Sequence, residues 1–176
     1  MKKDLVIFDG SNFYHGAKRL SPRTHLTDFS YRALAEEIAG SKNIEIEYCV
    51  GEIVQKKHHD KSFKLYANQQ ALFYNLEKQS IAIKKGFMLY SKLSFHEKGV
   101  DVQIALDISI GAIKNKYRKC YIISSDTDIL PAILEARAEG KKIIYVGFDK
   151  TISRTMKANC SKMICIKKEM IKKFSS

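Results

Sequence analysis

Four aspartates stand at the ends of predicted secondary-structure elements in a chain that is otherwise strongly basic. Asp9 and Asp126 each follow an apolar run, Asp101 begins an apolar helical segment, and Asp128 lies two residues after Asp126. The 31 Lys and Arg residues outnumber the 19 Asp and Glu residues, and the net charge is +12. Carboxylates gathered at element ends in a basic protein indicate a divalent cation held against a polyanion, as in a metal-dependent nuclease.

The chemistry of such a site follows from the oxygen ligands that aspartates supply. Hard, anionic oxygen ligands suit Mg²⁺ or Mn²⁺ better than softer transition metals. Carboxylates that converge within a few ångströms repel one another, so without a cation some of them must stay protonated. A bound ion would bridge a substrate phosphate, help to deprotonate an attacking water and stabilise the leaving oxygen.

Each aspartate also has a simpler structural explanation. Asp9 can begin a turn with Gly10, Asp101 can cap a helix, and Asp126 or Asp128 can cap the next helix. For any one of them taken alone, the capping role is favoured. The set favours a metal site, because a carboxylate in the apolar helix of Asp101 needs a partner and two acids in one turn exceed what one cap requires.

Polar residues beside the aspartates are candidates for positioning them. Ser11 and Asn12 follow Asp9 closely enough to orient its carboxylate or a metal-bound water. They could equally be turn formers or helix caps. Ser125 immediately precedes Asp126 and is a candidate for the same supporting role.

Asp107 is harder to assign, because it lies six residues after Asp101 and points to a different side of the helix. It could support the metal ligands, pair with a nearby cation or lie on the surface. Other chemistries have no motif in the sequence. The glycine-rich loops that bind nucleotide phosphates are absent, the histidines lack metal-binding spacing, and the cysteines form no C-x-x-C pair.

Apolar runs alternate with helical segments along the whole chain, which predicts an α/β fold around a mostly parallel sheet. The predicted strands are Leu5–Phe8, Ile44–Val54, Ile81–Tyr90, Tyr121–Ser124 and Lys142–Val146, with Met163–Ile166 as a candidate sixth. The predicted helices are Asp28–Ala39, Ser62–Gln79, Gly99–Ile113, Ile129–Ala138 and Lys167–Phe174. The third of these helices is apolar on nearly every side and is predicted to be buried.

A strand order of 3-2-1-4-5 would place the ends of the first and fourth strands side by side. Asp9 and the turn that holds Asp126 and Asp128 would then meet at the carboxyl edge of the sheet. Ligands of open parallel sheets bind at this edge, near the point where the strand order reverses. Asp101 would reach the same place from the helix that precedes the fourth strand.

The length and composition predict one folded domain over residues 1–176. A chain of 176 residues can bury a single core, and no repeat, low-complexity tract or linker divides it. No apolar stretch approaches the roughly 20 residues that cross a bilayer, and no cleavable hydrophobic segment follows the first residues. We therefore expect a cytoplasmic protein without a membrane partner.

Three motifs together resemble the NYN domain family, in its LabA-like branch, within the PIN-like nuclease superfamily. They are VIFDGSNF at 6–13, KGVD at 98–101 and ISSDTD at 123–128. Their order, spacing and strand context agree, and the resemblance covers nearly the whole chain. It implies a three-layer α/β/α sandwich with an acidic pocket that binds Mg²⁺ or Mn²⁺ and cleaves RNA phosphodiesters.

The resemblance also assigns positions within the motifs. The residues that match the family's core acidic positions are Asp9, Asp101 and Asp126, with Asp128 close behind. Asn12 and Asp107 fall at positions where the family often has those residue types.

Basic and aromatic residues near the motifs are candidates for RNA binding. The residues that we expect to contact phosphates, with little sequence preference, are Lys18, Arg19, Arg23, Lys92 and Lys98. Unpaired bases could stack on Tyr14, Phe13 or Tyr90, although core packing is the better explanation for Phe13.

Three functions are compatible with these features. The first is a metal-dependent ribonuclease that hydrolyses single-stranded RNA. The second is a catalytically silent RNA-binding or regulatory module that keeps the acidic pocket, and a homodimer is left open for either. The third is a Toprim or haloacid-dehalogenase-like phosphotransfer domain, which fits less well because Asp9 is not followed by D-x-D and Toprim pockets begin with Glu.

Overall fold

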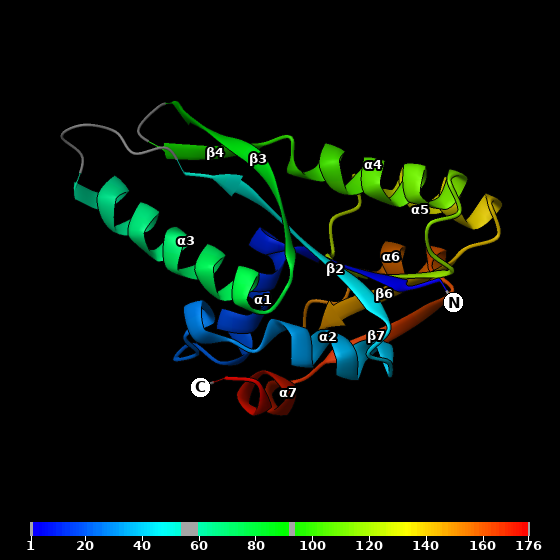
Figure 1. The fold of residues 1–176 in the computed structure, drawn as a ribbon, viewed down its shortest axis with the longest axis horizontal. Helices are drawn as coiled ribbons and strands as arrows, with labels where there is room; N and C mark the ends of the chain where they lie inside the picture. The colour runs from blue at the N-terminus through cyan, green and yellow to red at the C-terminus, as the bar shows by residue number, and fades with distance from the viewer. Residues whose placement is uncertain (1, 54–59, 92–93, 176) are drawn as a thin grey trace.

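The structure is a computed structural model that describes residues 2–53, 60–91 and 94–175 (Figure 1). The strands are β1 Asp4–Asp9, β2 Ile44–Glu52, β3 Ala82–Ser91, β4 Ser94–Lys98, β5 Lys119–Ile123, β6 Lys142–Phe148 and β7 Lys162–Ile166. The helices are α1 Gly10–Leu20, α2 Tyr31–Ala39, α3 Asp60–Lys78, α4 Val100–Ile113, α5 Leu130–Ala138, α6 Arg154–Asn159 and α7 Lys168–Lys173, with a 3-10 helix at Leu26–Asp28.

These strands form one sheet in the order β4-β3-β2-β1-β5-β6-β7. Each neighbouring pair is parallel except β3 and β4, which are antiparallel. Without the edge strand β4, this is the predicted order with the sixth strand added at the far side. The predicted α/β class and mostly parallel sheet are therefore confirmed, and β4 is an addition that the sequence did not indicate.

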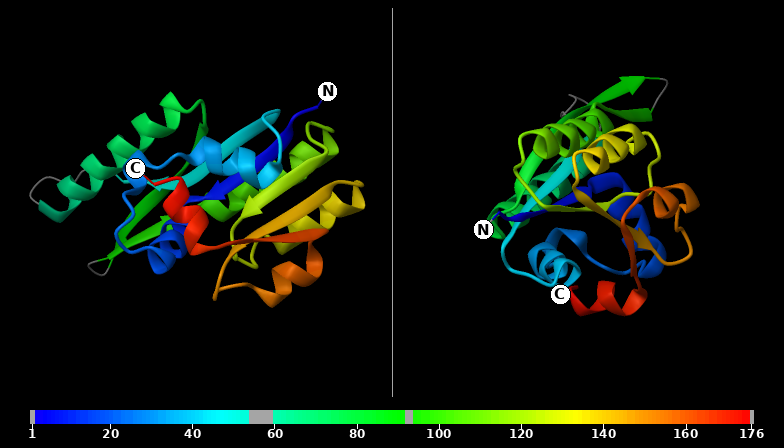
Figure 2. Two further views of the ribbon diagram at one scale, coloured as in Figure 1. Left: turned by 90° about the horizontal axis from the view of Figure 1, so that it is seen from below. Right: turned by 90° about the vertical axis from the view of Figure 1, so that its right-hand side faces the viewer.

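Helices cover both faces of the sheet and complete three layers (Figure 2). One core contains buried residues of α1, α2, α7 and the last turns of α3, and the other contains buried residues of α4, α5 and α6. Strand β1 contributes to both cores, with Val6 and Phe8 in the first and Leu5 and Ile7 in the second. This alternation explains why β1 is apolar at consecutive positions, as in parallel strands that are buried on both faces.

Two short helices, α1 and α6, were not predicted from the sequence. Helix α1 contains Gly10 and Gly16, and glycine weakens the helical signal because it favours helix by about 1 kcal/mol less than alanine. Tertiary packing accounts for Gly16, since a Cβ at this position would lie 2.3 Å from the ring of Phe148. The helix thus depends on a close approach to β6 more than on its own propensity.

The prediction that the helix at 99–113 is buried on all sides is wrong. Ile104 and Ile108 of α4 are fully buried, but Val102 is 63% exposed and Ile113 is 60% exposed. Helix α4 belongs to an outer layer, where the sheet and α5 cover only part of its circumference. The remaining stripe of apolar side chains faces outward.

The order of the strands brings the motifs together at the carboxyl edge of the sheet. Strand β1 ends at Asp9 and β5 ends at Ile123, and the register pairs Phe8 with Ile123. Helix α3 and the β3–β4 hairpin project beyond this edge (Figure 1). Within the described part of the chain, no helix is long and apolar enough to span a membrane.

Candidate active site

Asp9 is held firmly at the carboxyl edge. It ends β1, caps the first turn of α1 and is 2% exposed. Its Oδ2 accepts hydrogen bonds from Ser124 Oγ at 2.7 Å and Asn12 Nδ2 at 2.7 Å, and its Oδ1 accepts one from Asn12 N at 3.0 Å. Burial raises the pKa of Asp9, these hydrogen bonds lower it, and the charge of Glu97 raises it. The net effect is a pKa above the ordinary value of an aspartate, so burial disfavours the ionised form. A nearby cation would oppose this effect and favour the ionised carboxylate.

The turn after β5 is tied to Asp9 by the same polar side chains. Ser124 Oγ, which donates to Asp9, accepts a hydrogen bond from Asp126 N at 3.1 Å. Asn12 Oδ1 accepts one from Ser125 N at 3.2 Å. Asn12 therefore bridges Asp9 and this turn, which is the positioning role expected for a residue beside a metal ligand.

Asp101 and Asp128 complete a group of neighbouring carboxylates. Gly99 has φ +81°, a left-handed conformation that favours glycine, and it turns the chain from β4 into α4 so that Asp101 lies in the first helical turn. Burial raises the pKa of Asp101, and the charges of Asp126, Asp9 and Asp128 raise it further. Asp101 thus lies close enough to the other three predicted aspartates to interact with them through its charge.

The capping role considered for Asp126 is also present. Asp126 Oδ1 accepts a hydrogen bond from Asp128 N at 2.9 Å, which stabilises the turn before α5. One oxygen of Asp126 is therefore used locally, while Asp128 is exposed. The structural and the chemical explanations of Asp126 do not exclude each other.

Glu97 is a fifth carboxylate at this edge, and the sequence did not single it out. Its Oε1 accepts a hydrogen bond from Ser11 Oγ at 3.1 Å, and its Oε2 accepts one from Gly51 N at 2.8 Å. A Cβ at Gly51 would lie 2.9 Å from Glu97 Cγ, so the glycine permits this approach. The available signal was its position four residues before Asp101, directly ahead of the second motif.

We call this group the acidic cup; its members are Asp9, Glu97, Asp101, Asp126 and Asp128. The donor atoms are all carboxylate oxygens, which suits Mg²⁺ or Mn²⁺. Among residues 2–53, 60–91 and 94–175, no three Asp, Glu, His or Cys side chains are arranged to hold one ion. Mg²⁺ often binds through one or two carboxylates and keeps several waters, so the cup fits it in donor type.

Asp107 lies outside the acidic cup, in a second polar cluster beside the middle of α4. Lys84 Nζ is 4.0 Å from Asp107 Oδ1 and 3.5 Å from Glu47 Oε1. Gln103 Nε2 donates a hydrogen bond to Asp107 Oδ2 at 2.8 Å. The structure therefore places Asp107 as a partner of a lysine. Glu47 Oε2 is buried without a hydrogen-bond partner among the described residues, and the sequence did not indicate this cluster.

Glu47 gives a prediction about stability and pH. Burial and the charge of Asp107 raise its pKa from 4.5 to about 7, against the opposing effect of Lys84. Between these values the folded protein holds a proton that the unfolded chain has lost, so the free energy of unfolding should fall as the pH rises. Each tenfold change in proton affinity is worth about 1.4 kcal/mol, which limits the loss to about 3 kcal/mol.

Denaturant unfolding of the parent and of Glu47→Gln between pH 4 and pH 8 measures this effect. The variant should lose stability less steeply than the parent as the pH rises through this interval. Glu135→Gln, which removes an equal charge from an exposed position of α5, is the matched control and should keep the slope of the parent. Equal slopes for Glu47→Gln and the parent would contradict the assignment.

The predicted phosphate contacts are spread over different places. Lys98 is exposed at the end of β4, three residues before Asp101, and is the closest of them in sequence to the acidic cup. Lys18 Nζ instead donates hydrogen bonds to Pro22 O at 3.2 Å and Thr24 O at 2.8 Å, so it stabilises the loop after α1. Lys92 lies outside the described residues.

The other predicted RNA contacts lie farther along α1, in the loop after it or in the core. Arg19 and Arg23 are exposed, but Arg19 is roughly 15 Å from Asp9 along a helix that rises about 1.5 Å per residue. Tyr14 is 49% exposed, whereas Phe13 is fully buried and packs against other aromatic rings. The side chain of Tyr90 lies outside the part of the chain that the structure describes.

Comparison with solved structures identifies the class of fold. A crystal structure of a protein of unknown function from Vibrio parahaemolyticus is similar to this chain, with a TM-score of 0.68 and 16% sequence identity. The similarity covers 94% of this chain and 93% of that chain. At this identity it shows the α/β fold alone, which is consistent with a PIN-like three-layer sandwich. No curated protein matches the sequence.

The family is shown by the sequence itself. The NYN domain matches residues 5–167, which is nearly the whole chain and includes all members of the acidic cup. The chain therefore belongs to the NYN domain family, within the PIN-like nuclease superfamily. The predicted family is thus confirmed, and nucleic acid is the substrate class that the family implies.

Proposed function

We propose that this protein is a divalent-metal-dependent ribonuclease that hydrolyses phosphodiester bonds of single-stranded RNA. We assign it to the LabA-like branch of the family and place it in the cytoplasm. The observation that carries the proposal is Asp9, a nearly fully buried carboxylate that three donors fix at the carboxyl edge, with Asp101, Asp126 and Asp128 close enough to interact. If the four aspartates served only as helix caps, their carboxylates would not need to lie close to one another.

The residues of the acidic cup have separable roles in this proposal. Asp9, Asp101, Asp126 and Asp128 would hold Mg²⁺ or Mn²⁺. When bound, the ion would lower the pKa of an attacking water and stabilise charge on the phosphate. Asn12 and Ser124 fix the Asp9 carboxylate in one orientation, which limits the reorganisation needed when substrate binds. Ser11 acts indirectly, by donating to Glu97.

The basic charge of the chain supports an RNA substrate. A polyanion would otherwise be repelled by five carboxylates, and Lys98 next to the cup offers a phosphate contact. Single-stranded RNA is favoured because an unpaired strand can stack a base on the exposed ring of Tyr14. Arg19, near the end of α1, and Arg23, in the loop that follows, would extend the contact.

One observation favours the alternative of a silent RNA-binding module. In the described part of the chain, no three candidate ligands are arranged to hold one metal ion. A module of this kind would bind RNA at the same edge and leave it intact. The two functions differ in their response to metal.

Cleavage of a labelled single-stranded RNA separates them. The ribonuclease should cut the RNA with Mn²⁺ or Mg²⁺ and should stop when EDTA is added. RNA binding without cleavage under both conditions would favour the module. Cleavage that continues unchanged in EDTA would contradict the metal-dependent proposal.

A further inference from the structure

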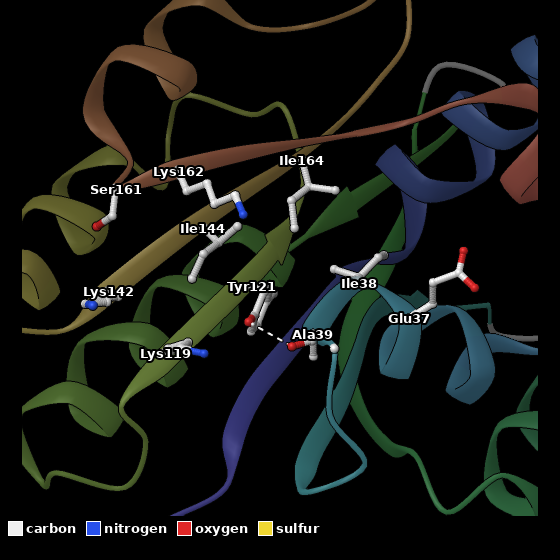
Figure 3. A pocket seen from close by; sticks show the side chains of 11 residues that line it. Glu37, Ile38, Ala39, Lys119, Tyr121, Lys142, Ile144, Ser161, Lys162 and Ile164 are labelled. Carbon is white, nitrogen blue, oxygen red and sulfur yellow. Dashed lines mark hydrogen bonds between the residues drawn. The ribbon is translucent and has the colours of Figure 1, made fainter.

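A second concave site lies at the opposite edge of the sheet from the acidic cup. It is a pocket of about 660 Å³ between the last residues of α2 and the first residues of β5, β6 and β7 (Figure 3). From Lys119 to Ile123, β5 rises by about 3.3 Å per residue, so Lys119 is roughly 13 Å from the end of the strand. The two sites therefore lie at different ends of β5.

Three lysines line one side of this pocket. Lys119, Lys142 and Lys162 are the first residues of β5, β6 and β7. The register pairs Lys119 with Lys142 and pairs Lys162 with Ile144, two residues farther along β6. Because alternate residues of a strand point to the same face, the three ammonium groups are directed to one side of the sheet. Figure 3 shows them on neighbouring strands.

Acidic residues of the protein do not neutralise this group. Lys119 Nζ is 3.5 Å from Asp4 Oδ2, which leaves one lysine paired. Within the described residues, the ammonium groups of Lys142 and Lys162 form neither an ion pair nor a hydrogen bond. Glu37 lines the other side of the pocket but pairs with Lys173. Like charges at neighbouring positions destabilise a sheet unless an anion offsets them.

The floor of the pocket is apolar. Tyr121 and Ile144 are each 5% exposed, and Ile38 and Ile164 lie beside them. The Tyr121 hydroxyl donates a hydrogen bond to Ala39 O at 3.3 Å, so its ring is held against the end of α2. A cationic rim over an apolar floor suits a ligand that has an anionic group attached to a flat, weakly polar ring.

We propose that this pocket binds the phosphate of a nucleotide, with the base on the apolar floor. The volume lies within the range of about 300–1,000 Å³ that is typical of small-molecule sites. Lysines bind phosphate as point charges, and Lys142 and Lys162 are available for this role. The nucleotide could be free or could stand at the phosphorylated end of an RNA strand. The site does not depend on catalysis at the acidic cup.

Calorimetric titration in EDTA tests the proposal with three probes: 5′-AMP, inorganic phosphate and a 5′-phosphorylated single-stranded RNA. A Lys142→Ala/Lys162→Ala double variant removes both unpaired ammonium groups and should weaken AMP binding at least about tenfold. This loss corresponds to about 1.4 kcal/mol of binding free energy. The matched control is Lys168→Ala/Lys172→Ala on α7, which removes two exposed lysines and should leave the Kd within twofold of the parent.

The two sources of the nucleotide give different results. AMP that binds at least as tightly as the RNA supports a free nucleotide, and RNA that binds at least tenfold more tightly, with the same loss in the pocket variant, supports a strand end. Equal effects of the two double variants would overturn the proposal. So would inorganic phosphate that binds as tightly as AMP, because the apolar floor would then have no part in binding.

Discussion

An Asp9→Asn protein is expected to cut single-stranded RNA at least about a hundredfold more slowly than the parent in Mn²⁺. Mutation of a residue that merely orients a metal ligand typically lowers metal affinity or activity by about 10–100-fold. Mutation of a direct ligand should lower activity at least as much. Asp9 is the most buried member of the acidic cup, so water has little room to replace its carboxylate. Initial rates of cleavage at saturating RNA measure the effect.

The fold should tolerate this change with a moderate loss of stability. Asparagine is as good a helix cap as aspartate, so the bond to Asn12 N can remain. Its amide nitrogen would then face Asn12 Nδ2, which is also a donor, and an unsatisfied buried group costs about 1–3 kcal/mol. Thermal unfolding shows whether the variant is folded under the assay conditions.

Asp4→Asn is the matched control for Asp9→Asn. Asp4 is also a buried aspartate of β1, but it lies at the opposite end of the strand and pairs with Lys119. This variant should keep its cleavage rate although it loses an ion pair. Asp9→Asn protein that is folded and cuts RNA at the rate of the parent would contradict the proposed function, as would equal losses in both variants.

The sheet could be predicted because most of its strands have a recognisable pattern in their own sequence. Runs such as Leu5–Phe8 are apolar at every position, since helices cover both faces, and turn residues bound them. Helix α1 and strand β4 could not be predicted in the same way. A glycine stands at position 16 because Phe148 of β6 leaves no space for a side chain, and β4 forms by antiparallel pairing with β3. Both causes lie in distant segments.

The burial of α4 was predicted wrongly for a related reason. Apolar residues around a helix show what the helix could bury, but the number of layers decides what is covered. Leu106 is 46% exposed because the sheet and α5 pack against other sides of the helix. The sequence pattern contains no information about this number.

In the candidate site, too, residues with a local sequence signal could be predicted and residues that depend on distant segments could not. Asp9 and Asp126 stand in distinctive local contexts, so strand ends and motifs were enough to select them. Glu97 has no such context, because a glutamate in a short edge strand resembles an ordinary surface residue. Its role becomes visible only when the fold brings Ser11 and Gly51 to its two oxygens. A partner that is 86 positions away in the chain leaves no local signal.

Glu97→Gln should reduce cleavage by about 10–100-fold at limiting metal concentration, the range typical of residues that support metal ligands. Glutamine keeps the shape of Glu97 and can preserve both contacts, because its oxygen can accept from Gly51 N and its amide can donate to Ser11 Oγ after the hydroxyl rotates. The change therefore removes a negative charge with little effect on structure, and higher Mn²⁺ concentration should restore part of the rate.

Two further variants distinguish the charge of Glu97 from its contacts. Glu97→Ala removes both acceptors and should also lower the free energy of unfolding by about 1–3 kcal/mol, because Gly51 N loses its partner. Glu45→Gln removes an equal charge from an exposed position in the amino half of β2 and should leave the metal dependence unchanged. If Glu97→Gln follows the metal titration of the parent, Glu97 acts only through its structural contacts and the cup reduces to the four aspartates. A shift toward higher metal concentration in Glu97→Gln but not in Glu45→Gln would instead mean that Glu97 contributes its charge to cation binding.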